Sequence, residues 1–207
     1  MKVYFVRHGE SVGNKAGLHQ KVDMPLSENG REQAGKIAER LKKFKIDVIF
    51  ASPITRARET AEIISGSLNI PVEILDNLIE AKGPSEIIGK AVKDPEARRI
   101  RNLIAENFTK GNWKYSDEEN YDELNIRARS FLDHILNHHK DKDILCVSHA
   151  TLIKFIVCKM VFGEELTPRI FHLFFHHFLT SNTGLTICEY EEEGGWWITH
   201  FNDASHL

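Results

Sequence analysis

The sequence lacks any uninterrupted apolar stretch of about 18 residues, the length that a membrane-spanning helix requires. We therefore expect no membrane partner, and because an apolar strand pattern begins at residue 2 we also expect no signal peptide. Cysteine is scarce: Cys146, Cys158 and Cys188 are widely spaced and form no CxxC pair. This usage favours reduced thiols in a cytoplasmic protein over disulfides or a zinc site.

A strong excess of charge of either sign is also absent. The 27 Lys and Arg residues face 30 Asp and Glu residues, for a formal charge of −3. This balance argues against non-specific binding to nucleic acid. Repeats and low-complexity tracts are missing as well, and 207 residues suffice for one domain with a large core. We expect a single domain over residues 1–207, with no nucleic-acid partner.

The clearest pattern that is present is an apolar, β-favouring run at residues 3–6, which stops abruptly at Arg7 and His8. A buried strand with this ending is costly unless both side chains open into a polar pocket. Gly9 then lets the backbone turn sharply and approach a ligand closely. A structural histidine beside a surface arginine explains the pair equally well, so the pair alone does not define a site.

Apolar runs alternate with segments of helical periodicity along most of the chain, which predicts an α/β fold with a mostly parallel sheet. Ser27 is expected to cap one helix, and Ser52 a second helix with Pro53 at its first position. Expected strands lie at about residues 3–6, 48–51, 72–74, 143–147, 184–190 and 196–201. Expected helices cover about residues 28–41, 53–66, 85–91, 95–107, 121–139, 150–160 and 171–178.

Residues 81–120 differ from the rest of the chain because charged residues are dense there and helix-breaking pairs interrupt them, Gly111-Asn112 among these. We expect this segment to be an insertion that lies over the end of the sheet, where lids and specificity loops are found. Trp113 and Tyr115 would then either stack on a substrate or pack the insertion against the core. A solvated excursion without a role in selectivity is the alternative.

Polar side chains follow several of the expected strands. His8 and His149 each come directly after a strand, so parallel neighbouring strands would bring both imidazoles to one edge of the sheet. Arg56 lies in the helix after another strand, and Glu80 follows the strand at 72–74. Arginine binds phosphate oxygens in bidentate geometry, helix N-termini add positive partial charge, and a glutamate there suits acid–base catalysis. The pattern predicts a metal-free site for a phosphate monoester.

At these positions the chain resembles the histidine phosphatase superfamily, which contains cofactor-dependent phosphoglycerate mutases and related phosphatases. Each motif is weak alone, whereas their common order over nearly the whole chain is specific. The resemblance implies a three-layer sandwich with a mostly parallel central sheet and helices on both faces. It rests on Arg7-His8-Gly9-Glu10-Ser11 with Asn14, Asp23-Met24-Pro25-Leu26-Ser27 with Gly30, Ser52-Pro53-Ile54-Thr55-Arg56-Ala57 with Thr60-Ala61, Glu80, Val147-Ser148-His149-Ala150, and Asn202-Asp203 with His206-Leu207.

The resemblance also implies a mechanism in two steps, without a metal or cofactor. His8 attacks phosphorus through one ring nitrogen while the other donates a hydrogen bond, and water then cleaves the phosphohistidine. Glu80 protonates the leaving oxygen and later activates the water. The implied partners are a small phosphorylated substrate and inorganic phosphate. The implied catalytic residues are His8, Glu80, His149, Arg7 and Arg56, and the implied substrate-binding residues are Arg7, Asn14, Arg56, His149 and Ala150.

Three functions are compatible with these residues. Mutases of this family carry a longer, basic and proline-rich insertion after the acid residue, and its absence here favours a phosphatase over a mutase. A non-catalytic phosphoprotein-binding module is the third, least favoured alternative. Basic residues of the insertion could still bind a second anion, but interspersed acidic residues make a solvated helix face equally reasonable. These basic residues are Lys82, Lys90, Arg98, Arg99 and Arg101.

The remaining histidines have simpler interpretations. His172 and His176 are one helical turn apart and next to His177, which resembles part of a metal cluster. No carboxylate or cysteine joins them in a known ligand pattern, so we expect structural or surface roles. For His206 we expect a structural contact in the tail, and for Arg58 a surface charge. An edge strand or the aromatic stretch at 171–178 could support a homodimer.

Overall fold

The computed structural model describes residues 1–110 and 112–207, so the predicted break at Gly111 lies outside the described residues. Six strands form one sheet within the described chain, in the order β3-β2-β4-β1-β5-β6. The first four in this order are mutually parallel, whereas β5 pairs antiparallel with β1, and β6 pairs antiparallel with β5 at the sheet edge. The predicted mostly parallel sheet is thereby confirmed. The strands are β1 (Lys2–Arg7), β2 (Val48–Ala51), β3 (Val72–Ile74), β4 (Ile144–Ser148), β5 (Leu185–Glu191) and β6 (Gly195–Asp203).

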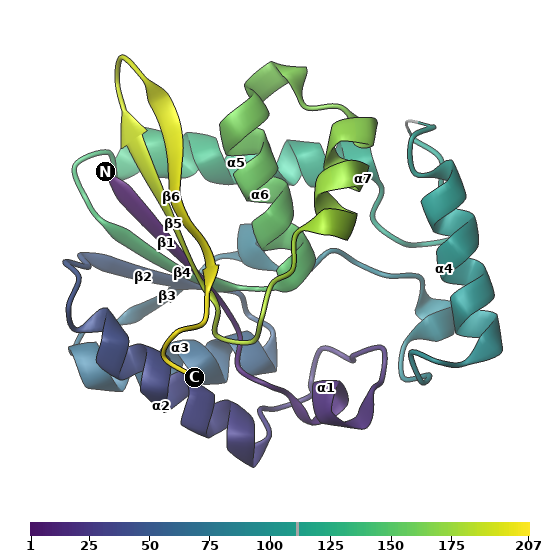
Figure 1. Cartoon of the computed structure of the whole chain (residues 1–207), viewed down its shortest axis with the longest axis horizontal. Helices are drawn as coiled ribbons and strands as arrows, with labels where there is room; N and C mark the ends of the chain where they lie inside the picture. The colour runs from purple at the N-terminus through teal and green to yellow at the C-terminus, as the bar shows by residue number, and fades with distance from the viewer. Residues whose placement is uncertain (111) are drawn as a thin grey trace.

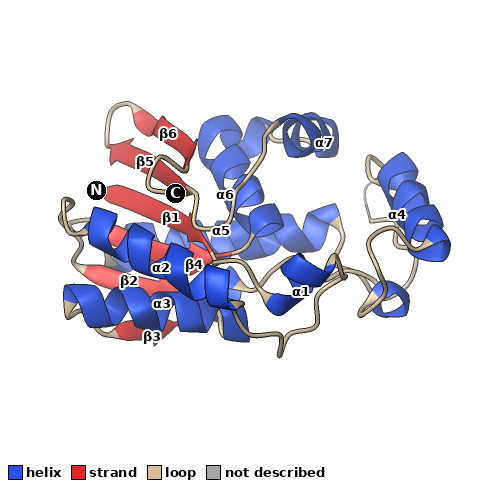
Figure 2. Cartoon of the chain, turned by 60° about the horizontal axis from the view of Figure 1, so that its bottom comes forward, coloured by secondary structure: helices blue, strands red, loops and turns tan. Residues whose placement is uncertain are grey.

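Helices cover both faces of this sheet (Figures 1 and 2). The pleat of β1 explains why, because Tyr4 and Val6 pack with α2 (Glu28–Leu41) and α3 (Thr55–Leu68). The alternate residues Val3 and Phe5 pack with α5 (Tyr121–His138) and α6 (Ala150–Phe162) on the other face. Each of these four β1 side chains is at most 3% exposed. The expected three-layer sandwich is confirmed.

The two helices on the first face begin differently. Ser27 caps α2 as predicted, because its hydroxyl accepts a hydrogen bond from the backbone N–H of Gly30 at 3.0 Å. The predicted start of α3 is wrong: the helix begins at Thr55, and Ile54 caps it without a side-chain hydrogen bond. Ser52 is not the cap because the chain bends at residues 53–54 before the helix starts, and its hydroxyl accepts the Ile54 N–H at 3.3 Å within that bend and bonds to His149 at 2.8 Å.

The charged insertion forms a small layer of its own beyond the carboxyl ends of the parallel strands (Figures 1 and 2). It contains η2 (Ser85–Ile87) and α4 (Pro95–Asn107), whose residues Ile87, Ala97 and Ile100 form a separate apolar cluster. Tyr115 packs against this cluster, so it supports the insertion itself. The remaining short elements are α1 (Val12–Ala16), η1 (Asp76–Leu78), η3 (Gly163–Glu165) and α7 (Pro168–His177).

The three cysteines are buried as free thiols, in keeping with the prediction of reduced cysteines. Burial raises the pKa of the Cys158 and Cys188 thiols to about 12, so they stay protonated in the core. Among the described residues, no helix is both long enough and apolar enough to cross a membrane.

Candidate active site

His8 lies directly after β1 and is 2% exposed. Its Nδ1 is 2.7 Å from the carbonyl oxygen of Gly9, and because a carbonyl only accepts, Nδ1 carries the proton. The other nitrogen, Nε2, then has a free lone pair and accepts a hydrogen bond from Arg56 Nε at 3.2 Å. Burial, together with the charges of Arg56 and Arg7, lowers the pKa of His8 well below its usual value. His8 is therefore a neutral imidazole with its lone pair on Nε2.

Two arginines, the buried Arg56 and the partly buried Arg7, stand beside His8. Arg56 is 4% exposed and donates to the carbonyl of Lys21 at 3.1 Å, and Arg7 donates to the carbonyl of Thr180 at 2.6 Å. Neither forms an ion pair with any described residue, and the Arg7 Nε is buried without a hydrogen-bond partner. Burial lowers the pKa of both groups, that of Arg56 to about 10, so both remain protonated at neutral pH. Two cations that form no ion pair, one of them buried, are costly beside an imidazole, which makes this a candidate anion-binding site.

His149 joins this group from the neighbouring strand. The parallel register pairs Arg7 with Ser148, so His149 follows β4 at the level where His8 follows β1. The two imidazole centroids are 5.1 Å apart, and His149 is fully buried. Its Nε2 bonds to Ser52, while its Nδ1 is buried without a partner. Burial and the nearby His8, Arg56 and Arg7 lower its pKa well below the usual value, so His149 is also neutral. The sequence correctly places both histidines at one sheet edge.

Glu80 reaches the same edge after η1. Its carboxylate accepts hydrogen bonds from the backbone N–H groups of Leu152 at 3.1 Å and Thr151 at 3.3 Å, in the first turn of α6. The Ala81 N–H adds a third at 2.9 Å. The charge of Glu80 raises the pKa of both Arg7 and Arg56, which places the carboxylate within electrostatic range of the two cations. Glu80 is thus fixed at the N-terminus of α6, beside the phosphate-binding candidates.

The two other carboxylates that could replace Glu80 are engaged elsewhere. Glu10 accepts a hydrogen bond from the hydroxyl of Ser27 at 2.5 Å, at the start of α2. Glu86 accepts one from the hydroxyl of Ser116 at 2.8 Å, within the insertion. Of these three acidic residues, only Glu80 has described hydrogen bonds to the first turn of α6, the helix that His149 precedes.

The last two predicted binding residues lie on helix starts. Asn14 is the third residue of α1, and its amide oxygen accepts the N–H of Ser11 at 3.2 Å in a capping box. Because this oxygen is engaged, the Nδ2 group of Asn14 is its available donor for an anion. Ala150 is the first residue of α6, directly after His149. Its position at a helix N-terminus suits contact with an anion through the backbone.

Sequence patterns did not indicate the loop after α7, which touches three site residues. Asn182 donates to the carbonyl oxygen of His8 at 2.9 Å and to the amide oxygen of Asn14 at 3.4 Å. The carbonyl of Thr180 in the same loop accepts from Arg7. These contacts exist because β5 pairs with β1 and brings the loop to its carboxyl end. No local motif carries that information, since two of the contacts involve backbone carbonyls.

Thr60 connects the two halves of the site. Its hydroxyl accepts a hydrogen bond from the Gly9 N–H at 3.0 Å and donates to the carbonyl of Arg56 at 2.7 Å. One side chain of α3 therefore holds the turn after β1 and the helix segment that bears Arg56. Thr60 belongs to the motif that carried the resemblance, but its sequence position alone did not reveal this bridging role.

The glycine after His8 has a different role from the predicted one. The turn after β1 packs directly on the start of α2, and a Cβ on Gly9 would overlap the carbonyl of Gly30. A Cβ on Gly30 would in turn overlap the carbonyl of Glu10. The structure assigns these glycines to a close backbone crossing, and Gly9 does not have a positive φ angle.

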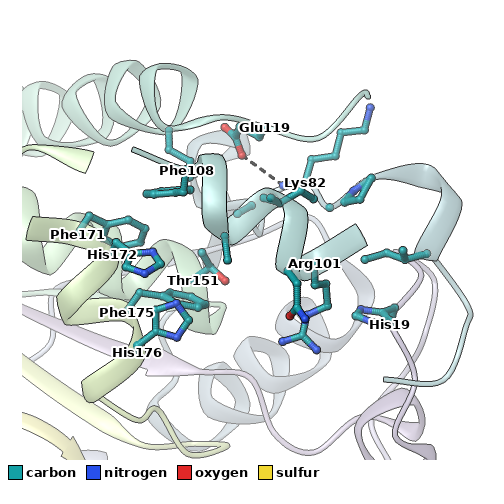
Figure 3. Close-up of a pocket in the computed structure, with 18 residues that line it drawn as sticks. His19, Lys82, Arg101, Phe108, Glu119, Thr151, Phe171, His172, Phe175 and His176 are labelled. Carbon is teal, nitrogen blue, oxygen red and sulfur yellow. Dashed lines mark hydrogen bonds between the residues drawn. The ribbon is translucent and has the colours of Figure 1, made fainter. Parts of the chain in front are cut away.

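A cavity of about 330 Å³ lies between α4, α7 and residues 81–84 (Figure 3), and it is lined by Ala81 and Thr151, whose backbone N–H groups hold Glu80, but not by Glu80 itself. His172 and His176 line it from α7, with ring centroids 4.4 Å apart, whereas His177 donates to the carbonyl of Leu173 at 2.8 Å. In the part of the chain that the structure describes, no three His, Cys, Asp or Glu side chains are arranged to hold a metal ion. His172 and His176 are therefore cavity walls.

The other candidate residues have structural contacts. Arg58 faces solvent and pairs with Glu62 at 3.5 Å, one turn along α3. His206 contacts the hydroxyl of Thr183 at 3.0 Å, a contact between the tail and the loop that carries Asn182. Both positions match the expected surface charge and tail contact.

The family profile described as "Histidine phosphatase superfamily (branch 1)" matches residues 3–204. The "Uncharacterized phosphatase PhoE" of Bacillus subtilis is 31% identical over 209 residues, covering 99% of this chain and 96% of that protein. The "Probable phosphatase C1687.21" of Schizosaccharomyces pombe is 32% identical over 220 residues, covering 100% of this chain and 95% of that protein.

Solved structures show the same likeness over the whole chain. A phosphoserine phosphatase mutant from Entamoeba histolytica, determined in complex with phosphoserine, has a TM-score of 0.80 and 27% identity. The match covers 100% of this chain and 98% of that one. A Bacillus stearothermophilus protein, YhfR, has a TM-score of 0.83 and 25% identity, and the match covers 99% of this chain and 98% of that one.

Proposed function

Because the chain belongs to the histidine phosphatase superfamily, we propose that it is a phosphatase that hydrolyses a small phosphomonoester through a phosphohistidine on His8, without a metal. The observation that carries this proposal is a pair of arginines without ion-pair partners, the buried Arg56 and the partly buried Arg7, around a neutral histidine whose Nε2 bears a lone pair. An anion satisfies the arginines, and a phosphorus atom held by them meets the lone pair. The same set of groups explains both binding and chemistry.

Binding begins with exchange of hydrogen bonds around Arg56. Its Nε–H bonds to His8 Nε2, and phosphoryl oxygens are stronger, charged acceptors for the same group. When Arg56 turns to the phosphate, the lone pair of His8 becomes free to attack. Arg7, His149 and the Nδ2 of Asn14 bind the remaining oxygens and stabilise the charge that spreads over them in the transition state.

The first chemical step forms a bond between His8 Nε2 and phosphorus while the bond from phosphorus to the leaving oxygen breaks. Glu80 enters this step as the protonated carboxylic acid and gives its proton to that oxygen, so the alcohol departs neutral and the carboxylate is left as the base for the second step. The hydrogen bond from Nδ1 to Gly9 persists and stabilises the positive charge on the phosphorylated ring. In the second step Glu80 takes a proton from water, the water oxygen attacks phosphorus, and His8 leaves as neutral imidazole.

Hydrolysis is the reaction named for the phosphatase relatives, and charge pairing in the insertion neutralises two of the five basic residues that could serve a mutase. A mutase needs a second site for an anionic group and a means of excluding water from the phosphohistidine. Lys82 pairs with Asp117 at 2.9 Å, and Arg99 pairs with Glu96 at 2.8 Å, so both cations are already neutralised. Phosphoprotein binding without turnover is disfavoured because a binding module has no use for a neutral, oriented nucleophile beside a carboxylate.

The test is single-turnover labelling with a ³²P-phosphomonoester in the presence of EDTA. We expect label on His8 that is lost in acid and kept in base, as a phosphoramidate requires, and no label in His8→Ala. His200→Ala is the matched control, because His200 is an exposed residue of β6 and should leave labelling intact. Label on serine or aspartate, or complete and reversible loss of activity on chelation, would contradict the proposal.

A further inference from the structure

The cavity beside Glu80 is large for the chemistry proposed at His8. Its volume of about 330 Å³ falls in the range of pockets for organic ligands and far exceeds one phosphate group. Figure 3 shows Phe108, Phe171, His172 and His176 on one side, and Arg101 with His19 on the opposite side. Such a space, open between two walls, has to be explained by something other than the reacting phosphate.

The position of the cavity relates it to the leaving group of the substrate. Thr151 and Ala81 both line the cavity, and their backbone N–H groups both donate to the carboxylate of Glu80. In an in-line displacement the leaving oxygen lies opposite the attacking nitrogen, next to the general acid. A cavity bordered by the residues that hold the acid is therefore where the organic part of the leaving group extends.

The walls of the cavity favour a flat, apolar group. Phe108, Phe171 and Phe175 contribute aromatic rings, and α4 adds the aliphatic Ile104. Phe175 is fixed by the buried Lys154, whose Nζ donates to the Phe175 carbonyl at 2.9 Å and lies 4.5 Å from the ring centroid. Aromatic groups stack on such rings with a gain beyond simple area burial.

One positive charge in the cavity stands without a partner. Lys82 is paired with Asp117, and Glu119 with Arg127 at 2.5 Å, so these lining charges are neutralised. Arg101 forms no ion pair with any residue that the structure describes, and burial lowers the pKa of His176 across the cavity, which stays neutral. An anionic group at the far end of an aromatic leaving group would meet the Arg101 guanidinium.

We propose that the cavity between α4 and α7 binds the leaving group, and that the substrate class is a phosphomonoester of an alcohol bearing a bulky aromatic group with a distal anionic substituent. This inference rests on the proposed function, since it takes Glu80 as the acid. In this inference Phe175 and its aromatic neighbours stack on the ring system of the leaving group, and Arg101 binds the anionic substituent. Small phosphates such as phosphoserine leave most of the cavity unfilled.

The experiment compares three alkyl phosphates with similar leaving groups: ethyl phosphate, 2-naphthylmethyl phosphate and 6-carboxy-2-naphthylmethyl phosphate. We expect kcat/KM to rise at least about tenfold from ethyl to naphthylmethyl, because a filled apolar pocket discriminates at this level. The carboxylate should add about two- to fivefold, the range of an exposed ion pair. Ala105→Trp, which fills the cavity from α4, should reduce the naphthylmethyl-to-ethyl ratio to about one.

Arg101→Gln should remove the advantage of the carboxylated substrate and keep the advantage of the naphthyl ring. Arg98→Gln is the matched control, because it removes the same charge from the same helix at an exposed position outside the cavity, and it should keep both ratios. Equal kcat/KM for the three substrates, with His8 still labelled by ethyl phosphate, overturns the inference and leaves the proposed function standing. If none of the three labels His8, both are overturned.

Discussion

Arg56 and His8 are joined by a hydrogen bond from the Arg56 Nε–H to His8 Nε2 at 3.2 Å, with both side chains buried. The contact fixes the imidazole in the tautomer that the carbonyl of Gly9 also requires. The nitrogen that would attack phosphorus is thus held by the guanidinium that would bind the phosphoryl group. One hydrogen bond thus orients both the proposed nucleophile and the proposed anion-binding group. When a phosphate binds, we expect the Arg56 guanidinium to donate to phosphoryl oxygens instead of to His8.

The first prediction follows from that contact and concerns Arg56→Lys. A lysine keeps the charge but lacks the planar guanidinium. It therefore cannot reproduce both the hydrogen bond to His8 and the bidentate hydrogen bonds to phosphoryl oxygens. We expect kcat to fall by about 10²–10³-fold and inhibition by inorganic phosphate to weaken. Steady-state kinetics with phosphate as a competitive inhibitor measures both effects. Arg58→Lys, an exposed neighbour on the same helix, is the control, and equal losses in the two variants would refute the assignment.

The second prediction separates Glu80 from the phosphate-binding residues. Glu80→Gln cannot protonate the leaving oxygen, so phosphorylation of His8 by alkyl phosphates should slow by about 10²–10⁴-fold. A nitrophenyl phosphate has a good leaving group and should lose far less. Single-turnover labelling with both substrates checks this, with Glu86→Gln as a surface control. Equal losses with the two substrates would show that Glu80 is not the acid.

The third prediction concerns stability at acid pH. The pKa of His8 and His149 is lowered by folding from an unfolded value of about 6.5, so the unfolded chain binds more protons below that pH. The free energy of unfolding should therefore fall as pH drops below about 6.5, by up to about 1.4 kcal/mol per pH unit for each histidine. His8→Asn should lessen the slope by about one proton. Urea unfolding at a series of pH values measures it, and parallel slopes for the two proteins would contradict the prediction.

The fourth prediction tests the crossing between the turn after His8 and α2. Gly30→Ala should destabilise the protein by about 1–3 kcal/mol, because the added methyl group overlaps the carbonyl of Glu10 and the backbone must shift. Gly35→Ala in the same helix has open space around its Cβ and should stabilise by about 0.5–1 kcal/mol. Thermal unfolding of both variants is the measurement. A neutral Gly30→Ala would mean that the crossing is looser than described.

The sequence was sufficient to predict the sheet and the edge at which His8 and His149 meet. Buried parallel strands are short apolar runs. A charged or imidazole side chain directly after such a run is costly to bury unless it lies in a polar pocket. The start of α3 was mispredicted because the chain bends at residues 53–54, and the Ser52 hydroxyl, a good cap by type, accepts the Ile54 N–H in that bend and also bonds to His149. That bond joins residues 97 positions apart.

The contacts of Asn182 and the cavity at Arg101 could not be predicted from the sequence, because both depend on how distant segments pack together. Asn182 donates to a backbone carbonyl, which any residue possesses, and it reaches His8 only through the pairing of β5 with β1. The cavity depends on how α4 and α7 are spaced, and hydrophobic periodicity reports which face of a helix is apolar but not the gap between two helices.

The hydroxyl of Thr60 sets the separation between the turn that carries the nucleophile and the helix that carries its cation, from a position with no exposed surface. A change at this residue would alter reactivity while every group that meets the substrate stays the same. Within the proposed mechanism, a substitution at Thr60 would therefore change the rate of phosphoryl transfer independently of the choice of substrate, which we propose that the cavity between α4 and α7 governs.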